Sequence, residues 1–314
     1  MRETDSFIHD PCSLITGPVK SVLAVLIGVA ILTGCSSSRF SFVVMSDVHL
    51  QGGNPLQKEI LDSMFFLVNN ASRKIHDSTG QTVGKPIAMF VTGDLTDSGT
   101  PEAWKEFEEV FGLHGDGALQ MPVYETFGNH DGGVNGAVRE GIRRRNPLRK
   151  DVVMISENGL HYAVEKKGYL FIVLGSYPGD EWDPACEWCH YFKESFREAD
   201  GSLAFLESTL RDNREGKNLP VFLLFHYGWD DFSKLWWTNA EQDRFYNALK
   251  DSRISGIFHG HNHQIDAYTW RGYDVFIAGS PQRGDKTGDA LFVSVKKDVI
   301  RVFVIGNDGI KALD

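Results

Sequence analysis

The sequence predicts an α/β fold, in which short buried strands alternate with amphipathic helices and run into polar residues. Three apolar runs in the first half, 40–45, 86–91 and 122–126, are separated by segments with helical spacing. Two later runs, 221–225 and 254–258, likewise lead into histidines. The β-α-β-α-β order of the first half predicts a largely parallel sheet covered by helices. The carboxyl ends of parallel strands meet at one edge, so the polar residues after them are expected to converge there.

The helices are predicted from apolar spacing and from capping residues. Apolar side chains recur at helical intervals from residue 55 to about residue 76. Thr100 followed by Pro101 is typical of a helix start and opens a second helix, which reaches residue 110. Two further helices are expected at 202–211 and 239–249.

The segment 132–151 is expected to be irregular. It is locally basic, which favours either a solvated face or an anion-attracting rim beside the polar residues that precede it. The basic residues are Arg139, Arg143, Arg144, Arg145, Arg149 and Lys150.

The second half is predicted to be rich in strands. The runs 161–164 and 169–174 alternate around a Lys-Lys-Gly turn and predict a hairpin. After residue 263 come four alternating apolar segments, which favour an antiparallel arrangement. They are 265–270, 273–278, 291–295 and 300–305.

The composition is that of a globular protein. The chain has 314 residues, of which 42% are hydrophobic and 24% are charged. Its formal net charge of -10 argues against nucleic acid as the main partner. The polar residues at the strand ends extend from Asp47 to His263, so one domain must hold them all.

The first 35 residues are interpreted as a signal peptide. The apolar run Val22–Leu32 is short for a membrane span but suits the core of a signal. It continues as Leu32-Thr33-Gly34-Cys35, which resembles the bacterial lipobox and predicts lipidation of Cys35. An uncleaved anchor or a plain secretory signal are the alternatives. Because Met1–Lys20 is not basic, translation is expected to start at Val19. This interpretation predicts a lipid-anchored protein of the bacterial cell envelope, outside the cytoplasm.

Of the four cysteines in the chain, the two that follow Cys35 lie in an insertion rich in aromatic residues, at about 175–200. Outside the cytoplasm, Cys186 and Cys189 are expected to form a short-loop disulfide, since a zinc site would need a second pair of ligands. Long loops in compact domains are commonly functional, so the insertion is interpreted either as a cap over the site or as a satellite hydrophobic cluster.

The polar residues that follow the strands have the chemistry of metal ligands. Carboxylates supply charge, an amide carbonyl adds a hard oxygen, and neutral imidazoles suit zinc, iron or manganese. Such a set can hold two divalent ions close together. The residues are Asp47, His49, Asp94, Asn129, His130, His226, His261 and His263.

In order and spacing, these motifs resemble the calcineurin-like metallophosphoesterases. The resemblance covers roughly Phe42 to Val304 and rests on Asp47-x-His49, Gly93-Asp94, Gly128-Asn129-His130-Asp131, His226 and Gly260-His261-x-His263. It implies a four-layer α/β/β/α sandwich within a single domain at 40–305. Carried over by position, Asp47, His49 and His263 would hold the first metal. Asn129, His226 and His261 would hold the second, and Asp94 would bridge both.

The resemblance implies hydrolysis of a phosphate ester by a hydroxide activated between two divalent ions, which would be manganese, iron or zinc. Phosphate monoesters are the expected substrates. His130 would act as general acid, and Asp131 would orient it and raise its pKa. The substrate would be a phosphorylated small molecule or a lipid head group. The alternatives are a phosphodiesterase acting on lipid head groups or nucleotides, and a non-catalytic binding lipoprotein.

Two residues differ from the motifs of known subfamilies and disfavour the activities of those subfamilies. Asp97 stands where purple acid phosphatases carry a tyrosine ligand, which disfavours a tyrosinate-iron centre. Ser98 stands where serine/threonine protein phosphatases carry an arginine, which disfavours protein phosphatase activity.

Overall fold

The computed structural model describes residues 39–76, 80, 82–133, 135–176, 201–281, 289–306 and 308–313. Residues Ser37–Asp314 group into one compact unit. The predicted signal segment with Cys35, and the insertion with Cys186 and Cys189, lie outside the described residues. Their lipidation, disulfide and capping roles therefore stay predictions. In the part of the chain that is described, no helix has both the length and the apolar character needed to cross a membrane.

The first sheet has six strands in the order β13-β12-β11-β1-β2-β3. β1, β2 and β3 are parallel, as the sequence predicts, and β11 pairs with β1 in the antiparallel sense. The bounds are β1 Arg39–Met45, β2 Pro86–Thr92, β3 Val123–Thr126, β11 Ala290–Lys296, β12 Val299–Gly306 and β13 Gly309–Leu313. β13 lies beyond residue 305, where the sequence analysis ended the domain.

The second sheet has seven strands in the order β4-β5-β6-β7-β8-β10-β9. The predicted hairpin is confirmed, since β5 and β6 are antiparallel neighbours. β6, β7, β8 and β10 are parallel, so the expected antiparallel arrangement of the C-terminal part fails where β10 joins β8. The bounds are β4 Val152–Ile155, β5 Tyr162–Lys166, β6 Tyr169–Val173, β7 Val221–Leu224, β8 Ile254–His259, β9 Asp266–Trp270 and β10 Tyr273–Ile277.

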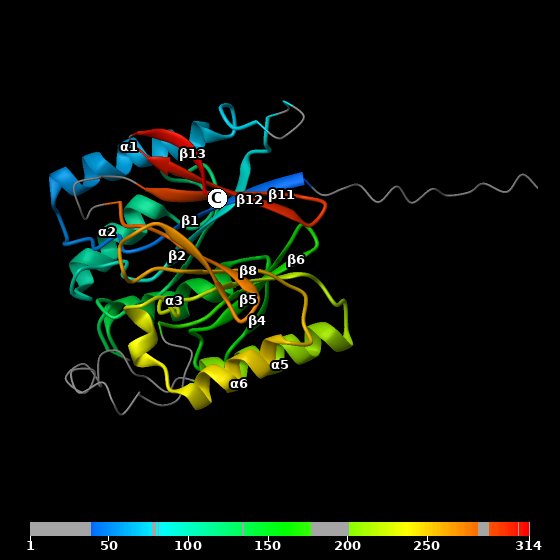
Figure 1. Ribbon diagram of the computed structural model, residues 1–314. Helices are drawn as coiled ribbons and strands as arrows, with labels where there is room; N and C mark the ends of the chain where they lie inside the picture. Colours follow the sequence, from blue (N-terminus) through cyan, green and yellow to red (C-terminus); the bar gives the residue numbers. More distant parts are fainter. Residues whose placement is uncertain are drawn as a thin grey trace, which may run out of the picture. The chain divides into compact units, whose positions relative to one another are not determined.

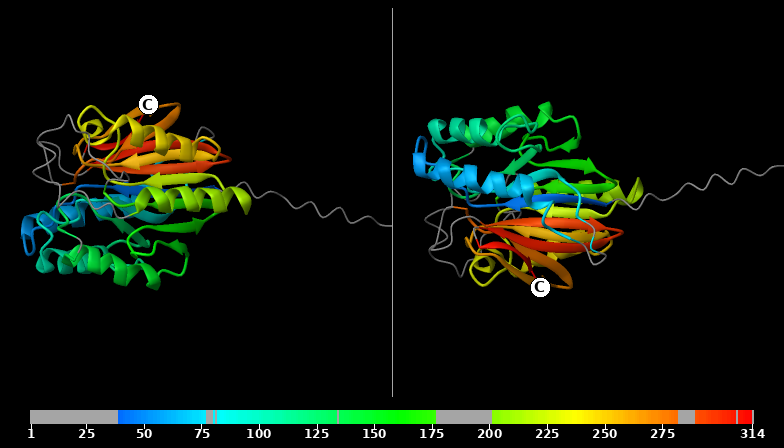
Figure 2. Two further views of the ribbon diagram at one scale, coloured as in Figure 1. Left: turned by 90° about the horizontal axis from the view of Figure 1, so that it is seen from below. Right: turned by 90° about the horizontal axis from the view of Figure 1, so that it is seen from above.

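Helices cover the outer face of each sheet, which gives the predicted α/β/β/α layers (Figure 1). α1 Pro55–Ala71, α2 Pro101–Phe111 and α3 Ala137–Arg145 pack on the first sheet. α5 Ser202–Glu215 and α6 Asn239–Leu249 pack on the second. Between the sheets lies a third apolar core that includes Phe42, Phe171 and Phe222. The strands of both sheets run side by side across the body in both views of Figure 2.

Helix ends follow local capping chemistry. The predicted start at Thr100 is confirmed, since its hydroxyl accepts a hydrogen bond from the backbone N–H of Ala103 at 3.2 Å. α1 ends at Ala71, earlier than residue 76, because Ser72 closes the helix and His76 forms a bridge with Thr82.

The prediction that 132–151 is irregular is wrong, because α3 lies within it. Apolar periodicity missed this helix because arginines occupy core positions. Arg139 is fully buried over the ring of Phe127, at 4.2 Å from its centroid. Gly141 lies against Trp104, whose ring would be only 2.1 Å from an added Cβ atom.

Two further arginines of this segment are buried around one carboxylate. Arg145 Nε lies 2.9 Å from Glu125 Oε1, and Arg149 Nη2 lies 2.5 Å from Glu125 Oε2. Burial alone would raise the pKa of Glu125, but the two guanidinium groups hold it below its usual range. These arginines therefore form neither a solvated face nor an anion-attracting rim.

Candidate dinuclear metal centre

The residues that the sequence singles out come from the carboxyl ends of strands in both sheets. Asp47 and His49 follow β1, Asp94 follows β2, and Asn129 to Asp131 follow β3. His226 follows β7, and the histidines 261 and 263 follow β8. β1, β2 and β3 are parallel neighbours, as are β7 and β8, so the loops of each sheet leave from a common edge.

Several of these residues have left-handed backbone conformations, which non-glycine residues rarely adopt. The φ angles are 53° for Asp47, 50° for His49, 48° for Asp94, 78° for His261 and 58° for His263. Such conformations cost free energy and persist where the surrounding structure enforces them. Here they turn each side chain sharply after its strand.

The first group of side chains could hold one metal ion. Asp47, His49, Asp94 and His263 each offer a ligand atom, and these atoms all lie within 4.8 Å of one another. The Nε2 atoms of His49 and His263 are 3.1 Å apart. His263 Nε2 is also 3.3 Å from Asp47 Oδ1, and His49 Nε2 is 3.6 Å from Asp94 Oδ2.

The second group could hold another ion, and it shares Asp94 with the first. Asp94, His226 and His261 bring their ligand atoms within 4.8 Å of one another. His226 Nε2 lies 3.4 Å from Asp94 Oδ2 and 3.1 Å from Asn129 Oδ1. One carboxylate oxygen of Asp94 therefore faces a histidine of each group.

The buried polar atoms of the two groups fit metal ions. Within the described part of the chain, both ring nitrogens of His261 are buried without a hydrogen-bond partner, as is Asp94 Oδ2. Unpaired polar atoms at such depth are costly unless an ion satisfies them. The backbone also leaves space around them. A Cβ atom on Gly128 would lie 2.2 Å from Asp94 Oδ1 and 2.8 Å from His226 Nε2.

Comparisons with known proteins agree with this arrangement. A family model described as calcineurin-like phosphoesterase matches residues 40–265. The chain belongs to the calcineurin-like phosphoesterase family. Comparison with curated protein sequences gives no significant match.

Solved structures share the fold of this phosphoesterase. A dimetal phosphatase from Danio rerio is 11% identical, with a TM-score of 0.56 over 87% of this chain and 98% of that one. GAP50, described as the anchor in the inner membrane complex of Plasmodium, is 13% identical, with a TM-score of 0.53 over 88% and 89% of the two chains. Together with the family match, the fold makes this chain a phosphoester hydrolase with candidate ligands for the metal centre typical of the family.

Neighbouring groups of the phosphoesterase direct the ligand nitrogens. The Nδ1 atom of His226 lies 2.8 Å from the carbonyl oxygen of Thr92, so it carries the proton and leaves Nε2 for a metal. His49 Nδ1 lies 3.4 Å from a carboxylate oxygen of Asp97, which favours the same tautomer. From the sequence, Asp97 was interpreted only as a difference from the purple acid phosphatases, so its contact with His49 was not predicted. Its position three residues after Asp94 could have indicated that it lies at the same site.

The hydroxyl of Tyr227 donates a hydrogen bond of 2.6 Å to Asn129 Oδ1. Tyr227 is fully buried, and its ring centroid lies 4.0 Å from that of His261. Burial, and after it the charge of Asp94, raises the pKa of Tyr227 well above its usual value, so the phenol stays protonated and donates. Sequence reasoning missed this residue, since a tyrosine after a histidine has no motif of its own.

The electrostatics of the site keep its carboxylates ionised. Burial would raise the pKa of Asp94, but His226 and other nearby histidines bring it below its usual range. Burial would lower the pKa of His226, but Asp94 raises it to about 9, so Nε2 also carries a proton in the metal-free site, and a metal ion would displace that proton. Burial holds the pKa of His261 well below its usual value, so that ring is neutral and available as a ligand.

The prediction that Asp131 orients His130 is wrong. Asp131 accepts hydrogen bonds from the backbone N–H groups of Leu95, Thr96 and Gly128, at 3.1, 2.8 and 2.8 Å. It therefore joins the loop after β2 to the loop after β3. Burial raises the pKa of Asp131 to about 6. The backbone carbonyl of Asp97 orients His130 instead, at 2.8 Å from Nδ1.

Proposed function

We propose that this protein is a metal-dependent phosphatase that hydrolyses phosphate monoesters outside the cytoplasm. In this proposal, Asp47, His49 and His263 hold one metal ion, and Asn129, His226 and His261 hold the other. Asp94 bridges the two. The observation that supports the proposal most strongly is the position of the Asp94 carboxylate, which faces both groups of ligand atoms.

The donor set is a mixture of imidazole nitrogens, carboxylates and one amide carbonyl, which suits manganese, iron or zinc. Two such ions would bind the phosphoryl oxygens and supply an activated water at neutral pH. The protein keeps the ligands in place before any ion binds. The backbone N–H of His130 donates to Asp94 Oδ1 at 2.8 Å, and the N–H of His261 donates to Asp47 Oδ2 at 3.0 Å.

His130 is proposed to donate a proton to the leaving group. A carbonyl oxygen only accepts hydrogen bonds, so the contact with Asp97 fixes the proton on Nδ1. In the protonated imidazole, Nε2 is then the atom that can release a proton. The side chain is half-buried at the site, with its ring centroid 4.7 Å from that of His49. This proton matters most for a poor leaving group.

A substrate assay with Mn²⁺ tests the proposal. The body from Ser36 onward is compared on nitrophenyl phosphate and bis-nitrophenyl phosphate, with Asp94→Asn as the blank. We expect faster hydrolysis of the monoester. His130→Ala is expected to lose about 10²–10⁴-fold on an alkyl phosphate and much less on nitrophenyl phosphate. Equal losses on both esters would remove the acid role, and preference for the diester would replace the monoester assignment.

Lipidation itself is tested by expressing the full chain in a bacterial host and measuring the mass of the mature N-terminal peptide. The diacylglyceryl group should be present on the wild-type peptide and absent from Cys35→Ala. A wild-type chain cut elsewhere or left uncut would rule out the anchor.

A further inference from the structure

A buried histidine lies directly before the last two candidate ligands. His259 is the last residue of β8, it is fully buried, and it precedes Gly260 and His261. Its Nδ1 atom lies 3.0 Å from the carbonyl oxygen of Gly260, and its Nε2 atom lies 3.0 Å from the hydroxyl oxygen of Tyr268 on β9. A buried imidazole that has a hydrogen bond on each ring nitrogen is held in one orientation.

The protons of these contacts have one arrangement. A carbonyl oxygen only accepts hydrogen bonds, so Nδ1 of His259 carries the proton and donates to Gly260. Nε2 then accepts from the hydroxyl of Tyr268, which itself accepts a hydrogen bond of 2.8 Å from the backbone N–H of Trp229. Burial raises the pKa of Tyr268, so its hydroxyl keeps the proton that it donates. These hydrogen bonds form a continuous connection between two backbone groups, the Tyr268–His259 bridge.

The bridge joins the two loops of the second sheet that carry candidate ligands. Trp229 lies three residues after His226 in the loop after β7, and Gly260 lies directly before His261 in the loop after β8. The same loops are also joined by one backbone hydrogen bond, from the N–H of Gly260 to the carbonyl oxygen of His226, at 3.1 Å. Two hydrogen-bonded connections therefore fix the position of His226 relative to His261.

The neighbouring residues are shaped to admit this bridge. A Cβ atom on Gly228 would lie 2.2 Å from His259 Nε2, so only glycine at this position leaves room for the imidazole. The ring of Trp229 stacks on that of Trp270, with centroids 3.7 Å apart. Trp270 and Tyr268 are two residues apart on β9, so their side chains point to the same face of the sheet. β9 therefore supports the loop after β7 through both side chains.

We propose that His259 and Tyr268 are positioning residues for the second metal ion of the phosphoesterase. They act through His226 and His261, by holding these two histidines at the separation that one ion requires. The first ion should depend on the bridge less, because most of its candidate ligands come from loops of the first sheet. The proposal rests on the proposed function, since it takes the two histidines as ligands of one ion.

Calorimetry with Mn²⁺ in two single-site backgrounds tests the positioning role. His49→Ala leaves the second group of ligands intact, and His261→Ala leaves the first group intact. In His49→Ala, the further substitution Tyr268→Phe should weaken binding of the remaining ion about 10–100-fold, as the loss of a contact that orients a ligand does elsewhere. In His261→Ala, the same substitution should leave the affinity almost unchanged. Equal losses in the two backgrounds, or no loss in His49→Ala, would overturn the proposal.

Substitutions of His259 separate its hydrogen bonds from its packing. Glutamine can still accept from Tyr268 through its side-chain oxygen, whereas leucine fills the space without accepting. In the His49→Ala background, His259→Gln should therefore keep more of the Mn²⁺ affinity than His259→Leu. Combining Tyr268→Phe with His259→Leu should cost no more affinity than His259→Leu alone, because both changes break the same bridge. Losses that add would show two independent effects and refute the bridge.

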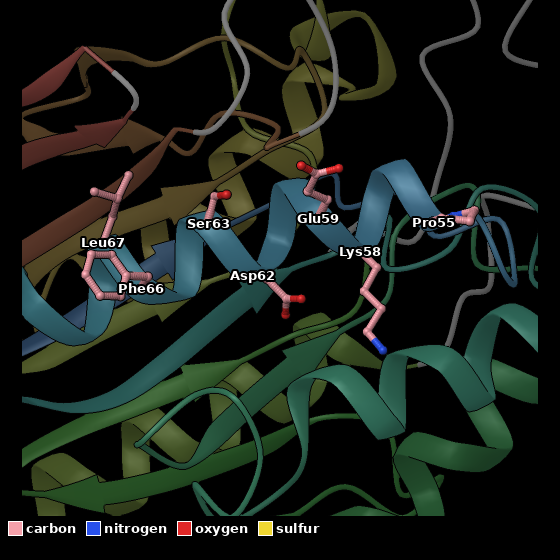
Figure 3. Close-up of a pocket in the computed structure, with 7 residues that line it drawn as sticks. All are labelled: Pro55, Lys58, Glu59, Asp62, Ser63, Phe66 and Leu67. Atoms are coloured by element: carbon pink, nitrogen blue, oxygen red, sulfur yellow. The ribbon is translucent and has the colours of Figure 1, made fainter.

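Two variants control for the loss of a hydroxyl group. Tyr169→Phe removes a buried phenol that donates to Asp298 Oδ1 at 2.6 Å. Ser63→Ala removes a hydroxyl from the exposed groove on α1, which no candidate ligand lines (Figure 3). Both should bind Mn²⁺ as the wild type does, and urea unfolding without metal should show that Tyr268→Phe is folded. A loss of affinity in Tyr169→Phe as large as in Tyr268→Phe would reduce the effect to general stability and overturn the proposal.

The same titrations separate the positioning role from the function on which it rests. A wild type that binds no Mn²⁺ at either group would refute the metal-dependent function, and the positioning role with it. A wild type that binds two ions, with Tyr268→Phe having no effect in the His49→Ala background, would refute the positioning role alone.

Discussion

Replacing Tyr227 by phenylalanine should weaken the second metal site selectively. The substitution removes the 2.6 Å hydrogen bond to Asn129 Oδ1 and leaves the buried ring in place against His261. An amide oxygen has two lone pairs, so it can accept from Tyr227 and bind a metal at the same time. Without the hydroxyl of Tyr227, this hydrogen bond no longer holds the Asn129 side chain with its oxygen, rather than its NH₂ group, facing the site.

The size of the effect follows from comparable ligand-orienting contacts, whose loss costs about 10–100-fold in metal affinity. That factor corresponds to about 1.4–2.7 kcal/mol. The phenol stays protonated, so the hydrogen bond is present across the neutral pH range. Fold stability should change far less than metal affinity, because the ring contacts with Trp236 and His261 remain.

The assay is Mn²⁺ titration by calorimetry, together with metal analysis after gel filtration. The wild type should retain two ions per chain, and Tyr227→Phe should retain one and bind the other weakly. Tyr162→Phe is the matched control, since that buried phenol donates to the Glu125 carbonyl at 2.8 Å without contacting a candidate ligand. Full retention of both ions by Tyr227→Phe, or an equal loss in Tyr162→Phe, would refute the reasoning.

Two other substitutions have defined outcomes. Gly128→Ala should abolish binding of both ions, because its Cβ would lie 2.2 Å from the shared Asp94 carboxylate. Gly133→Ala is the control, since its Cβ would enter open space and both ions should bind normally. Metal analysis of the two purified variants tests this difference. Glu125→Gln should lower the free energy of unfolding by about 3–5 kcal/mol at neutral pH, because two buried arginines lose their counter-charge. The pKa of Glu125 is lowered in the folded state, so its contribution is present above the usual carboxyl range and is lost as the pH falls through the folded pKa. Urea unfolding at several pH values should therefore show the two proteins converging in acid; a constant difference would contradict this.

Local sequence determined most of the strands, most of the helices and the order of the polar residues. Most strands are apolar runs, although β4 and β13 were not predicted, and α6 has the predicted bounds, 239–249. The residues proposed as ligands directly follow strands, so the alternation of strands and helices was enough to place them at common edges. α3 escaped prediction because its buried faces carry Arg139 and Arg145, whose burial depends on partners distant in sequence.

Only the tertiary structure decided how the two sheets combine to form one site. His226 and Thr92 are far apart in the chain, yet their contact fixes the tautomer of a candidate ligand. Tyr227 and Asn129 are likewise far apart in the chain, and no sequence motif indicates their hydrogen bond. Asp131 shows the reverse case, since its place beside His130 in sequence suggested a partner that the fold does not provide. Sequence patterns specify which side chains leave a strand, but the packing of the two sheets determines which of them meet.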